Sequence, residues 1–470
     1  MREVELQPRS VSVLEGSALA HDIAMLRASL DRATERLEGR TLWHVNSAAE
    51  GGGVAELLHQ LLGYIMGAGI ACRWQVVEGT EDFFHITKRI HNRLHGSRGD
   101  AGPLGDVERA IYRSATRENL RPFLEVANAD DVAVLHDPQT AGLVAPLIDA
   151  GLRVVWVCHV GVDEPNDMVR SAWEFLLPLV QRADAVVFSR ATYVWDGLVP
   201  PVSIIPPCID PTSPKNVELS AAIRDAYLVG AGVIAPSGLP ATTADAPNVR
   251  SRAETVEVAP APGDRPLIVQ ISRWDRLKDH VGVLEAFSTY VDPSLDAHLL
   301  LAGPAAGSVD DDPEAKEVLA DNVDAWQKLP DAARERIHLI SLPMDDPEEN
   351  AYIVNALQRE AMVVVQKSLA EGFGLTVAEA MWKTRPMIAS RVGGIQDQIV
   401  DGESGLLIDA RDPEAFGTAV TSLLRDPGFA QAMGHAGRER IRGHFLPPRF
   451  LSRHLDLVAG IVGRDPAVGS

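Results

Sequence analysis

The sequence predicts an α/β protein built from two doubly wound, Rossmann-like domains. Three observations predict this class. Short apolar runs rich in valine and isoleucine alternate with stretches of helical periodicity, the pattern of a parallel sheet covered by helices. The alternation occurs twice, on either side of a break near residue 210. Glycines and charged residues gather where the expected strands end, which is where ligands bind in such sheets.

The expected elements follow this rhythm from one end of the chain to the other. In the first half we expect a helix over 53–69 and strands over 41–47, 72–78, 131–137, 152–160 and 183–189. In the second half we expect strands over 266–272, 297–303, 336–342, 361–366 and 385–390. Between the halves, residues 229–265 are rich in Ala, Pro, Gly, Val and Thr without periodicity, which predicts a flexible insertion.

The 470 residues are enough for two domains with sizeable cores. The predicted division, in chain order, is a helical lead-in, an N-terminal Rossmann-like domain, a C-terminal Rossmann-like domain and a helix packing back on the N-terminal domain: 1–38, 39–210, 211–446 and 447–470. Two such domains would face each other across a cleft.

Composition narrows the class of protein. The net charge is −21, from 44 basic and 65 acidic residues, which argues against nucleic acid or an anionic membrane as a partner. No apolar run is long enough to cross a membrane, and the first ten residues lack the apolar core of a signal peptide. Cys72, Cys158 and Cys208 are too scattered for a disulfide framework or a metal site. We therefore expect a reduced, cytoplasmic setting.

The stretch SLAEGFGLTVAEAM (368–381) places two carboxylates around a glycine turn. It follows a valine-rich strand and leads into a helix, whose first N–H groups favour an anion by about 0.3–1 kcal/mol per contact. Glu371 in the loop and Glu379 in the helix are suited to hydroxyl groups instead. A phosphate flanked by two sets of hydroxyls describes a nucleotide-sugar. A capped surface helix with two solvated acids explains the stretch equally well.

Two more loops follow predicted strands. In SRWDRLKDH, Arg273 and Lys278 could converge on a diphosphate and stabilise its charge as it leaves; ordinary solvated surface charge is the alternative. In NSAAEGGGVAE, Gly52 and Gly53 would let a phosphate approach the backbone and the following helix N-terminus. A plain tight turn is about as compatible with these glycines.

Polar residues also end two strands of the first half. His159 follows the strand VVWVC and would point into the mouth of the cleft, beside the reacting sugar; a core histidine is the alternative. His44 lies within its strand and is assigned mostly to the core. Asp137 or Gln139, after another strand, could bind acceptor hydroxyls.

Taken together, these stretches resemble the retaining glycosyltransferases of the GT-B fold in family four, which contains sucrose and glycogen synthases. EGFGLTVAEA matches the family's E-x7-E pattern, and SRWDRLKD matches its R-x4-K pair. The N-terminal half is most similar to the trehalose glycosyltransferring synthases, through NSAAEGGGVAELLH, HDPQTAGL and PPCIDPTSPKNVEL. The fungal-type trehalose phosphorylases share much of this pattern.

The resemblance implies a role for each matching residue. The first domain would bind the acceptor and the second the nucleotide-sugar. The catalytic residues would be Arg273, Lys278, Glu371 and His159. The donor would be bound by Gly52, Gly53, Gly372, Phe373, Gly374, Leu375, Thr376 and Glu379, and the acceptor by Asp137, Gln139 and Asp163. The resemblance departs at Val157 and Gly161, where an arginine and an aspartate are expected, and this concerns the acceptor.

The implied reaction moves glucose from a nucleoside-diphosphate-glucose to glucose, with retention, and forms trehalose. No cofactor is expected; magnesium could stimulate the reaction, although no site for it is visible in the sequence. The expected partners are the nucleotide-sugar and the sugar acceptor, with no nucleic acid and no integral membrane contact, and a homodimer is compatible with the family. The alternatives are a trehalose phosphorylase, a retaining transferase with another sugar acceptor, a sugar-nucleotide epimerase and a non-enzymatic nucleotide-sugar binding protein.

Overall fold

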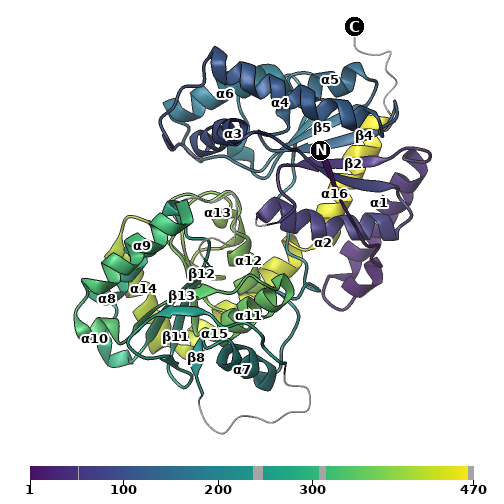
Figure 1. Ribbon diagram of the computed structural model, residues 1–470. Helices are drawn as coiled ribbons and strands as arrows, with labels where there is room; N and C mark the ends of the chain where they lie inside the picture. Colours follow the sequence, from purple (N-terminus) through teal and green to yellow (C-terminus); the bar gives the residue numbers. More distant parts are fainter. Residues whose placement is uncertain (51, 237–246, 306–313, 464–470) are drawn as a thin grey trace. The chain divides into compact units, whose positions relative to one another are not determined.

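The computed structural model describes residues 1–50, 52–236, 247–305 and 314–463, and it confirms the α/β class. Within these residues, two seven-stranded sheets organise the chain (Figure 1). One compact unit spans Met1–Asp210 together with the segment from His444 onward, and the other spans Pro211–Gly443. The division after Asp210 falls where the sequence places the break between the two halves.

The first unit is built on a sheet in the order β1-β3-β2-β4-β5-β6-β7. Its strands are β1 (Arg2–Val4), β2 (Leu42–Asn46), β3 (Cys72–Val76), β4 (Val132–His136), β5 (Arg153–Cys158), β6 (Ala185–Phe188) and β7 (Val202–Ile204). All neighbouring strands are parallel except β1, which pairs antiparallel with β3. Every residue of β2 and β4 is buried, because helices cover both faces of a parallel sheet.

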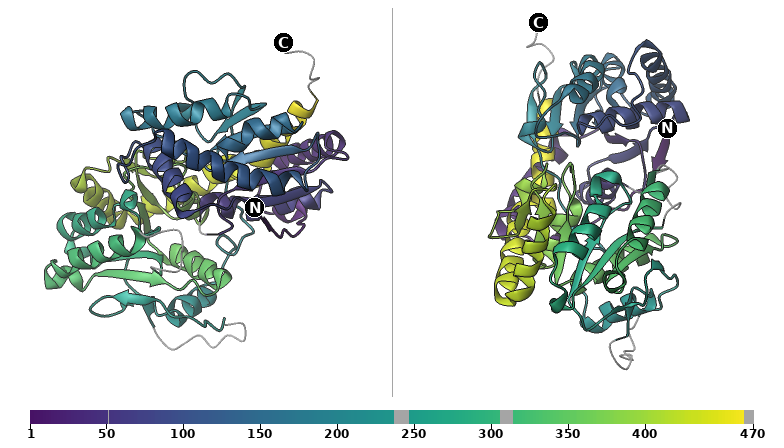
Figure 2. Two further views of the ribbon diagram at one scale, coloured as in Figure 1. Left: turned by 45° about the horizontal axis from the view of Figure 1, so that its top comes forward. Right: turned by 90° about the vertical axis from the view of Figure 1, so that its left-hand side faces the viewer.

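Helices lie on both faces of this sheet (Figure 1). They are α1 (Ala20–Arg36), α2 (Gly53–Gly67), α3 (Glu81–Leu94), α4 (Asp106–Leu124), α5 (Val144–Asp149), α6 (Asp167–Val180) and α16 (Pro447–Val462), with 3-10 turns η1 (Val11–Leu14), η2 (Ala141–Leu143) and η3 (Ala191–Tyr193). The α3, α4 and α6 helices pack together, whereas α16, drawn in yellow, runs alongside α1 (Figure 2). The C-terminal helix is therefore part of the first unit.

The second unit repeats the architecture with the sheet order β16-β15-β14-β11-β12-β13-β9. The strands of this unit are β8 (Ile234–Ala235), β9 (Glu254–Val256), β10 (Ala261–Pro262), β11 (Leu267–Ile271), β12 (His298–Pro304), β13 (Ile337–Leu342), β14 (Val363–Gln366), β15 (Met387–Ser390) and β16 (Leu406–Ile408). The helices are α7 (Ala221–Gly230), α8 (His280–Tyr290), α9 (Glu314–Gln327), α10 (Asp331–Arg334), α11 (Pro347–Glu360), α12 (Leu375–Trp382), α13 (Ile395–Gln398), α14 (Pro413–Arg425) and α15 (Pro427–His444), with η4 (Arg276–Lys278) and η5 (Pro293–Leu295).

Two segments differ from the sequence-based prediction. The lead-in is not helical throughout, since residues 2–4 form the edge strand β1. Parts of the predicted insertion form short strands: β9 pairs antiparallel with β13, and β10 pairs with β8. Strands of two or three residues leave no periodicity in the sequence, and the exposed edge of a neighbouring strand supplies their hydrogen bonds. The central part of that segment, 237–246, lies outside the described residues.

The segment joining the two units begins at a buried carboxylate. Asp210 is fully buried, and its Oδ2 accepts hydrogen bonds from Arg9 Nη1 at 2.7 Å and from the Tyr64 hydroxyl at 3.0 Å. A buried charge requires such partners. None of the described helices is long and apolar enough to span a membrane.

His454, on the buried face of α16, predicts a pH dependence of stability. Burial lowers its pKa to about 4, while a histidine in an unfolded chain titrates near 6.5. As pH falls from 6.5 towards 4, the unfolded chain binds a proton that the folded chain does not, so the free energy of unfolding declines by at most about 1.4 kcal/mol per pH unit. His454→Phe should therefore show a shallower loss of urea midpoint between pH 7 and pH 5 than the parent protein. Equal slopes for the two proteins would contradict this assignment.

Candidate active site

In the second unit, the loops after β11 and β14 are tied together. These strands are parallel neighbours, so their carboxyl ends lie side by side. Gln270, fully buried at the end of β11, donates from Nε2 to the carbonyl of Lys278 at 2.9 Å and accepts from the N–H of Lys367 at 3.2 Å. Leu369 N–H also donates to the Leu277 carbonyl at 2.7 Å. The arginine–lysine loop and the glutamate–glycine loop are thus one hydrogen-bonded structure.

This connection brings two of the predicted catalytic side chains together. Lys278 Nζ lies 2.5 Å from Glu371 Oε2, and each side chain is only 14% exposed. The Ser368 hydroxyl donates to the same Glu371 oxygen at 3.3 Å. Arg273 is more open, at 42% exposed, with Nη2 3.5 Å from Asp275 Oδ2. The loop therefore presents an arginine and a lysine that nearby carboxylates hold in place.

The glycine loop before α12 is shaped by close backbone contacts. Gly374 has φ +86°, in the left-handed region, and forms the N-cap of α12. Gln398 Nε2 donates to the Phe373 carbonyl at 2.5 Å, and Gly394 N–H donates to the Gly372 carbonyl at 3.1 Å. A Cβ on Gly394 would lie 2.7 Å from the Gly372 oxygen, which leaves no room for a side chain. The loop at 393–394 thus fixes the turn that begins α12.

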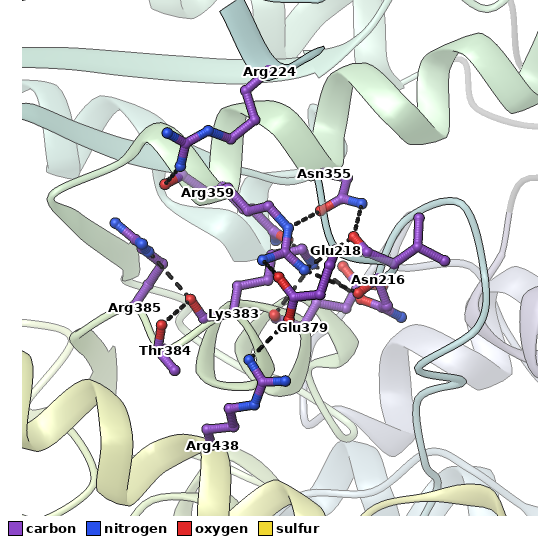
Figure 3. A network of polar contacts seen from close by, with 12 residues as sticks. Asn216, Glu218, Arg224, Asn355, Arg359, Glu379, Lys383, Thr384, Arg385 and Arg438 are labelled. Carbon is purple, nitrogen blue, oxygen red and sulfur yellow. Dashed lines mark hydrogen bonds and ion pairs between the residues drawn. The ribbon is translucent and has the colours of Figure 1, made fainter. Parts of the chain in front are cut away.

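Glu379 lies in the second turn of α12 and is buried, at 4% exposed. One turn further on, the fully buried Lys383 ammonium has three acceptors: Asn216 Oδ1 at 3.0 Å, Gln358 Oε1 at 2.7 Å and the Glu379 carbonyl at 3.2 Å (Figure 3). An ammonium has three N–H donors, so these three bonds satisfy it. Lys383 therefore holds the helix carrying Glu379 against the segment that follows Asp210.

Arg359, on α11, anchors the same segment. Its guanidinium donates to the carbonyls of Asn216 and Val217 at 3.1 and 3.0 Å and to Glu218 Oε2 at 2.6 Å (Figure 3). Asn355 accepts from Arg359 Nε at 2.9 Å and donates to the Val217 carbonyl at 2.9 Å. The sequence analysis assigned no role to Lys383 or Arg359, because a basic residue in a helix is usually solvated.

In the first unit, Gly52 and Gly53 are exposed where α2 begins. Gly52 is the N-cap in extended backbone, and a Cβ built on it would meet no atom within 4 Å. Position 52 therefore has room for a side chain. Asn46 steadies the start of the preceding loop, through a bond from its Nδ2 to the Ala48 carbonyl at 2.6 Å. Gly51 lies outside the described residues.

Asp137 and His159 are brought together at the ends of β4 and β5. Asp137 has φ +64°, and its Oδ1 accepts the backbone N–H of His159 at 2.8 Å. Burial raises the pKa of the Asp137 carboxyl, and the neighbouring His159 opposes that shift. Gln139 follows in the same turn, with a buried Oε1 that has no hydrogen-bond partner among the described residues. Asp137 thus has a clear structural role in shaping the loop around His159.

Comparisons with known proteins match both units. The family described as "Trehalose synthase, N-terminal domain" matches residues 44–195, and "Glycosyl transferases group 1" matches residues 251–440. A trehalose synthase of Rubrobacter xylanophilus is 37% identical over 442 residues, covering 93% of this chain and 94% of that protein. The chain belongs to the trehalose synthase family. It is accordingly a GT-B glycosyltransferase.

Two further similarities place this trehalose synthase family member among its relatives. An α,α-trehalose-phosphate synthase structure from Burkholderia vietnamiensis superimposes with a TM-score of 0.67 at 14% identity, covering 92% of this chain and 98% of that one, which shows a shared fold. A trehalose phosphorylase of Pleurotus sajor-caju is 25% identical, covering 84% of this chain and 54% of that protein.

The structure accounts for one departure from the trehalose synthase pattern. A Cβ on Gly161, where an aspartate is expected, would lie 2.2 Å from Cγ of Tyr193. The Tyr193 ring is buried, so an aspartate at 161 would require it to move. Asp163, two residues later, pairs instead with Arg190 at the end of β6, and the Thr192 hydroxyl lies 3.4 Å from the same carboxylate.

Arg190, the partner of the predicted acceptor residue Asp163, was not singled out from the sequence. Arg190 directly follows the strand predicted over 183–189. The other candidate residues were chosen because they are polar and follow a predicted strand, and the same criterion selects Arg190. Among the described residues, no group of three histidine, cysteine, aspartate or glutamate side chains is arranged to hold a metal ion.

The packing of Gly394 against the glycine loop predicts a sensitive position. Gly394→Ala should displace the turn at 372–374 and lower kcat/KM at least about tenfold, because small misplacements of binding groups are costly. Gly443→Ala is the matched control, since a Cβ there meets no atom within 4 Å. Steady-state kinetics and melting curves of both variants test this. Equal kinetics for the two would show that the loop tolerates the methyl group.

Proposed function

We propose that this enzyme transfers glucose from a nucleoside-diphosphate-glucose to free glucose, with retention at the anomeric carbon, and so forms trehalose. The observation that carries the proposal is the convergence of Lys278 and Glu371 beside the glycine turn that begins α12. A cation, a carboxylate and a helix N-terminus in one place suit a diphosphate joined to a sugar. Membership of the trehalose synthase family supports the choice of sugar.

The second unit supplies the donor contacts in this proposal. Arg273 and Lys278 neutralise the diphosphate, Glu371 accepts hydrogen bonds from sugar hydroxyls, and Glu379 holds the ribose. The backbone of the glycine loop lines the sugar and phosphate, with residues Gly372, Phe373, Gly374, Leu375 and Thr376. In the first unit, Gly52 and Gly53, which are exposed at the start of α2, add backbone contacts to the phosphates.

The reaction requires no covalent nucleophile. The bond between C1 of the glucosyl group and the diphosphate oxygen breaks, and a bond to the acceptor oxygen forms on the same face of the sugar. The acceptor's hydroxyl proton passes to the departing diphosphate oxygen. The protein contributes positive charge for the leaving group and orientation of both substrates. No cofactor takes part, and magnesium is dispensable because Arg273 and Lys278 supply the charge.

The acceptor contacts come from the first unit. His159 lies beside the reacting sugar, and Asp137, Gln139 and Asp163 bind acceptor hydroxyls. The trehalose synthase pattern places an arginine and an aspartate where this chain has Val157 and Gly161. The pair formed by Asp163 and Arg190 supplies the same two charges from other positions, which supports an acceptor site with a different arrangement. We also propose that the enzyme is cytoplasmic and works as a homodimer.

A trehalose phosphorylase is the second candidate, because a phosphorylase is similar over most of this chain. Such an enzyme would use phosphate as the glucosyl acceptor and would need no ribose contact.

Product analysis separates these reactions. Purified protein, a panel of nucleoside-diphosphate-glucoses and glucose should give a 1,1-linked α,α-disaccharide and a nucleoside diphosphate, read by proton NMR. Glucose 1-phosphate formed from trehalose and phosphate, without turnover of any nucleotide-sugar, would move the assignment to a phosphorylase. Donor consumption without glucose would indicate epimerisation, and a different disaccharide would name another acceptor.

The two cations should act on the chemical step. Arg273→Ala and Lys278→Ala should each lower kcat about 10²- to 10³-fold, because each removes charge stabilisation of the leaving diphosphate. Arg276→Ala is the matched control. Arg276 lies between them in the sequence, but its guanidinium pairs with Asp321, 2.8 Å away, and with Glu317, both on α9. Its kcat should stay within about twofold of the parent value. Unchanged kcat in Arg273→Ala, with donor binding intact by calorimetry, would remove Arg273 from the mechanism.

Glu379 gives an independent prediction about the donor. Glu379→Gln should raise KM for the nucleotide-sugar about tenfold, since a carboxylate–hydroxyl bond is worth roughly 1.5–3 kcal/mol and the amide retains part of it. The KM for glucose should not change. A phosphorylase would retain full activity in this variant, so the outcome also separates the two candidate functions.

A further inference from the structure

Three histidines form a hydrogen-bonded row across adjacent parallel strands of the first unit. Nδ1 of His44, in β2, lies 3.1 Å from Nε2 of His136, the last residue of β4. Nδ1 of His136 lies 3.1 Å from Nε2 of His159, directly after β5. The His136 and His159 rings are stacked with an interplanar angle of 9° and centroids 5.4 Å apart. The row leads from the interior of the sheet to the proposed sugar site.

The chemistry of imidazole restricts this row. A neutral ring has one N–H donor and one lone pair, and each contact between rings uses one of each. His136 uses both of its nitrogens, so it must donate through one and accept through the other. Hydrogen bonding therefore runs in a single direction along the row. Once one ring adopts a given tautomer, the hydrogen bonds impose the same tautomer on the other two rings.

Burial keeps the row neutral. His44 and His136 are 2% and 3% exposed, and burial lowers the pKa of each well below its ordinary value. At the inner end, Nε2 of His44 is buried without a hydrogen-bond partner among the described residues. His44 lines a cavity of about 20 Å³ among mainly apolar side chains of α2 and α16, and His136, His159 and His454 border the same cavity.

The outer end of the row is accessible. His159 is partly exposed, and its Nδ1 lies outside the row. The titratable groups beside it are His136, Asp137 and, on α16, His454. Asp137 holds the backbone N–H of His159, so the main chain and the ring of this residue are each fixed by a separate partner.

We propose that His44 and His136 are positioning residues that hold His159 as a neutral imidazole in a single tautomer, so that Nδ1 meets the reacting sugar in one fixed hydrogen-bonding role. The proposal rests on the proposed function for its sugar ligand. A sugar hydroxyl can act as a hydrogen-bond donor or as an acceptor. A nitrogen that only donates, or only accepts, allows the hydroxyl just one of these two orientations. That restriction orients the sugar before reaction, which is a recognised source of rate enhancement.

The test combines nitrogen NMR of histidine-labelled protein with kinetics. In the parent protein, Nδ1 and Nε2 of His159 should show the well-separated shifts of one tautomer. His136→Phe keeps an aromatic ring but removes both contacts, and should move the two shifts towards each other. Its kcat should fall about 3- to 10-fold, the loss expected for one hydrogen bond, with KM for glucose unchanged.

Three further variants complete the test. His136→Asn keeps one hydrogen bond to Nε2 of His159 and should lose less of kcat than His136→Phe, but its amide can present either N–H or oxygen and should leave the tautomer of His159 unfixed. His454→Phe is the matched control, because His454 borders the same cavity and its ring lies 5.4 Å from the His44 ring, tilted by 35°, without a hydrogen bond to the row. It should leave the His159 shifts and kcat unchanged. If His136→Phe does not fold, His44→Phe should loosen the tautomer of His159 from the far end of the row.

The NMR shifts are measured without turnover, so this test can succeed or fail independently of the proposed function. Averaged shifts for His159 in the parent protein would overturn the proposal. So would a single tautomer that persists in His136→Phe, or that persists in His44→Phe when His136→Phe does not fold. A protein that makes no trehalose but shows the expected shifts would overturn the sugar ligand and leave the row intact.

Discussion

The two loops proposed to bind the donor are joined by a buried amide. Gln270 joins the loop after β11 to the loop after β14 through two hydrogen bonds, and it does so from inside the sheet where water cannot compete. Its two bonds explain why Lys278 and Glu371, 93 residues apart in the chain, lie in contact. Together with the bond from the Leu369 N–H to the Leu277 carbonyl, Gln270 keeps the two loops from being independent surface turns.

A second layer of polar contacts supports the helix behind those loops. Lys383 and Arg359 are buried cations, and each donates to amide or carbonyl oxygens of the segment after Asp210. Burying an ammonium is costly unless each of its donors is satisfied, and here all three are. The position of α12, and with it that of Glu379, is therefore coupled to the chain that joins the two units.

In the proposed acceptor site, strand register places the polar groups. Adjacent parallel strands end at the same edge of the sheet, so residues near their ends become neighbours. The register of β2, β4 and β5 puts His44, His136 and His159 in a row. The left-handed backbone of Asp137 then turns its carboxylate back to the chain at His159. The loops after the strands hold residues proposed to bind the acceptor, and the strand register sets the distances between the histidines.

The sequence by itself determined the fold class and the main site loops, because alternating apolar runs and glycine turns are local patterns. It located Glu371, Lys278 and His159 at strand ends, where the structure also has them, although their proposed roles stay predictions. Only the tertiary structure decided which of these residues meet. The pairing of Lys278 with Glu371, the burial of Lys383 and the exclusion of a side chain at Gly161 by Tyr193 all depend on segments distant in the chain. No local pattern encodes such contacts, since each arises from strand order and close packing across the unit.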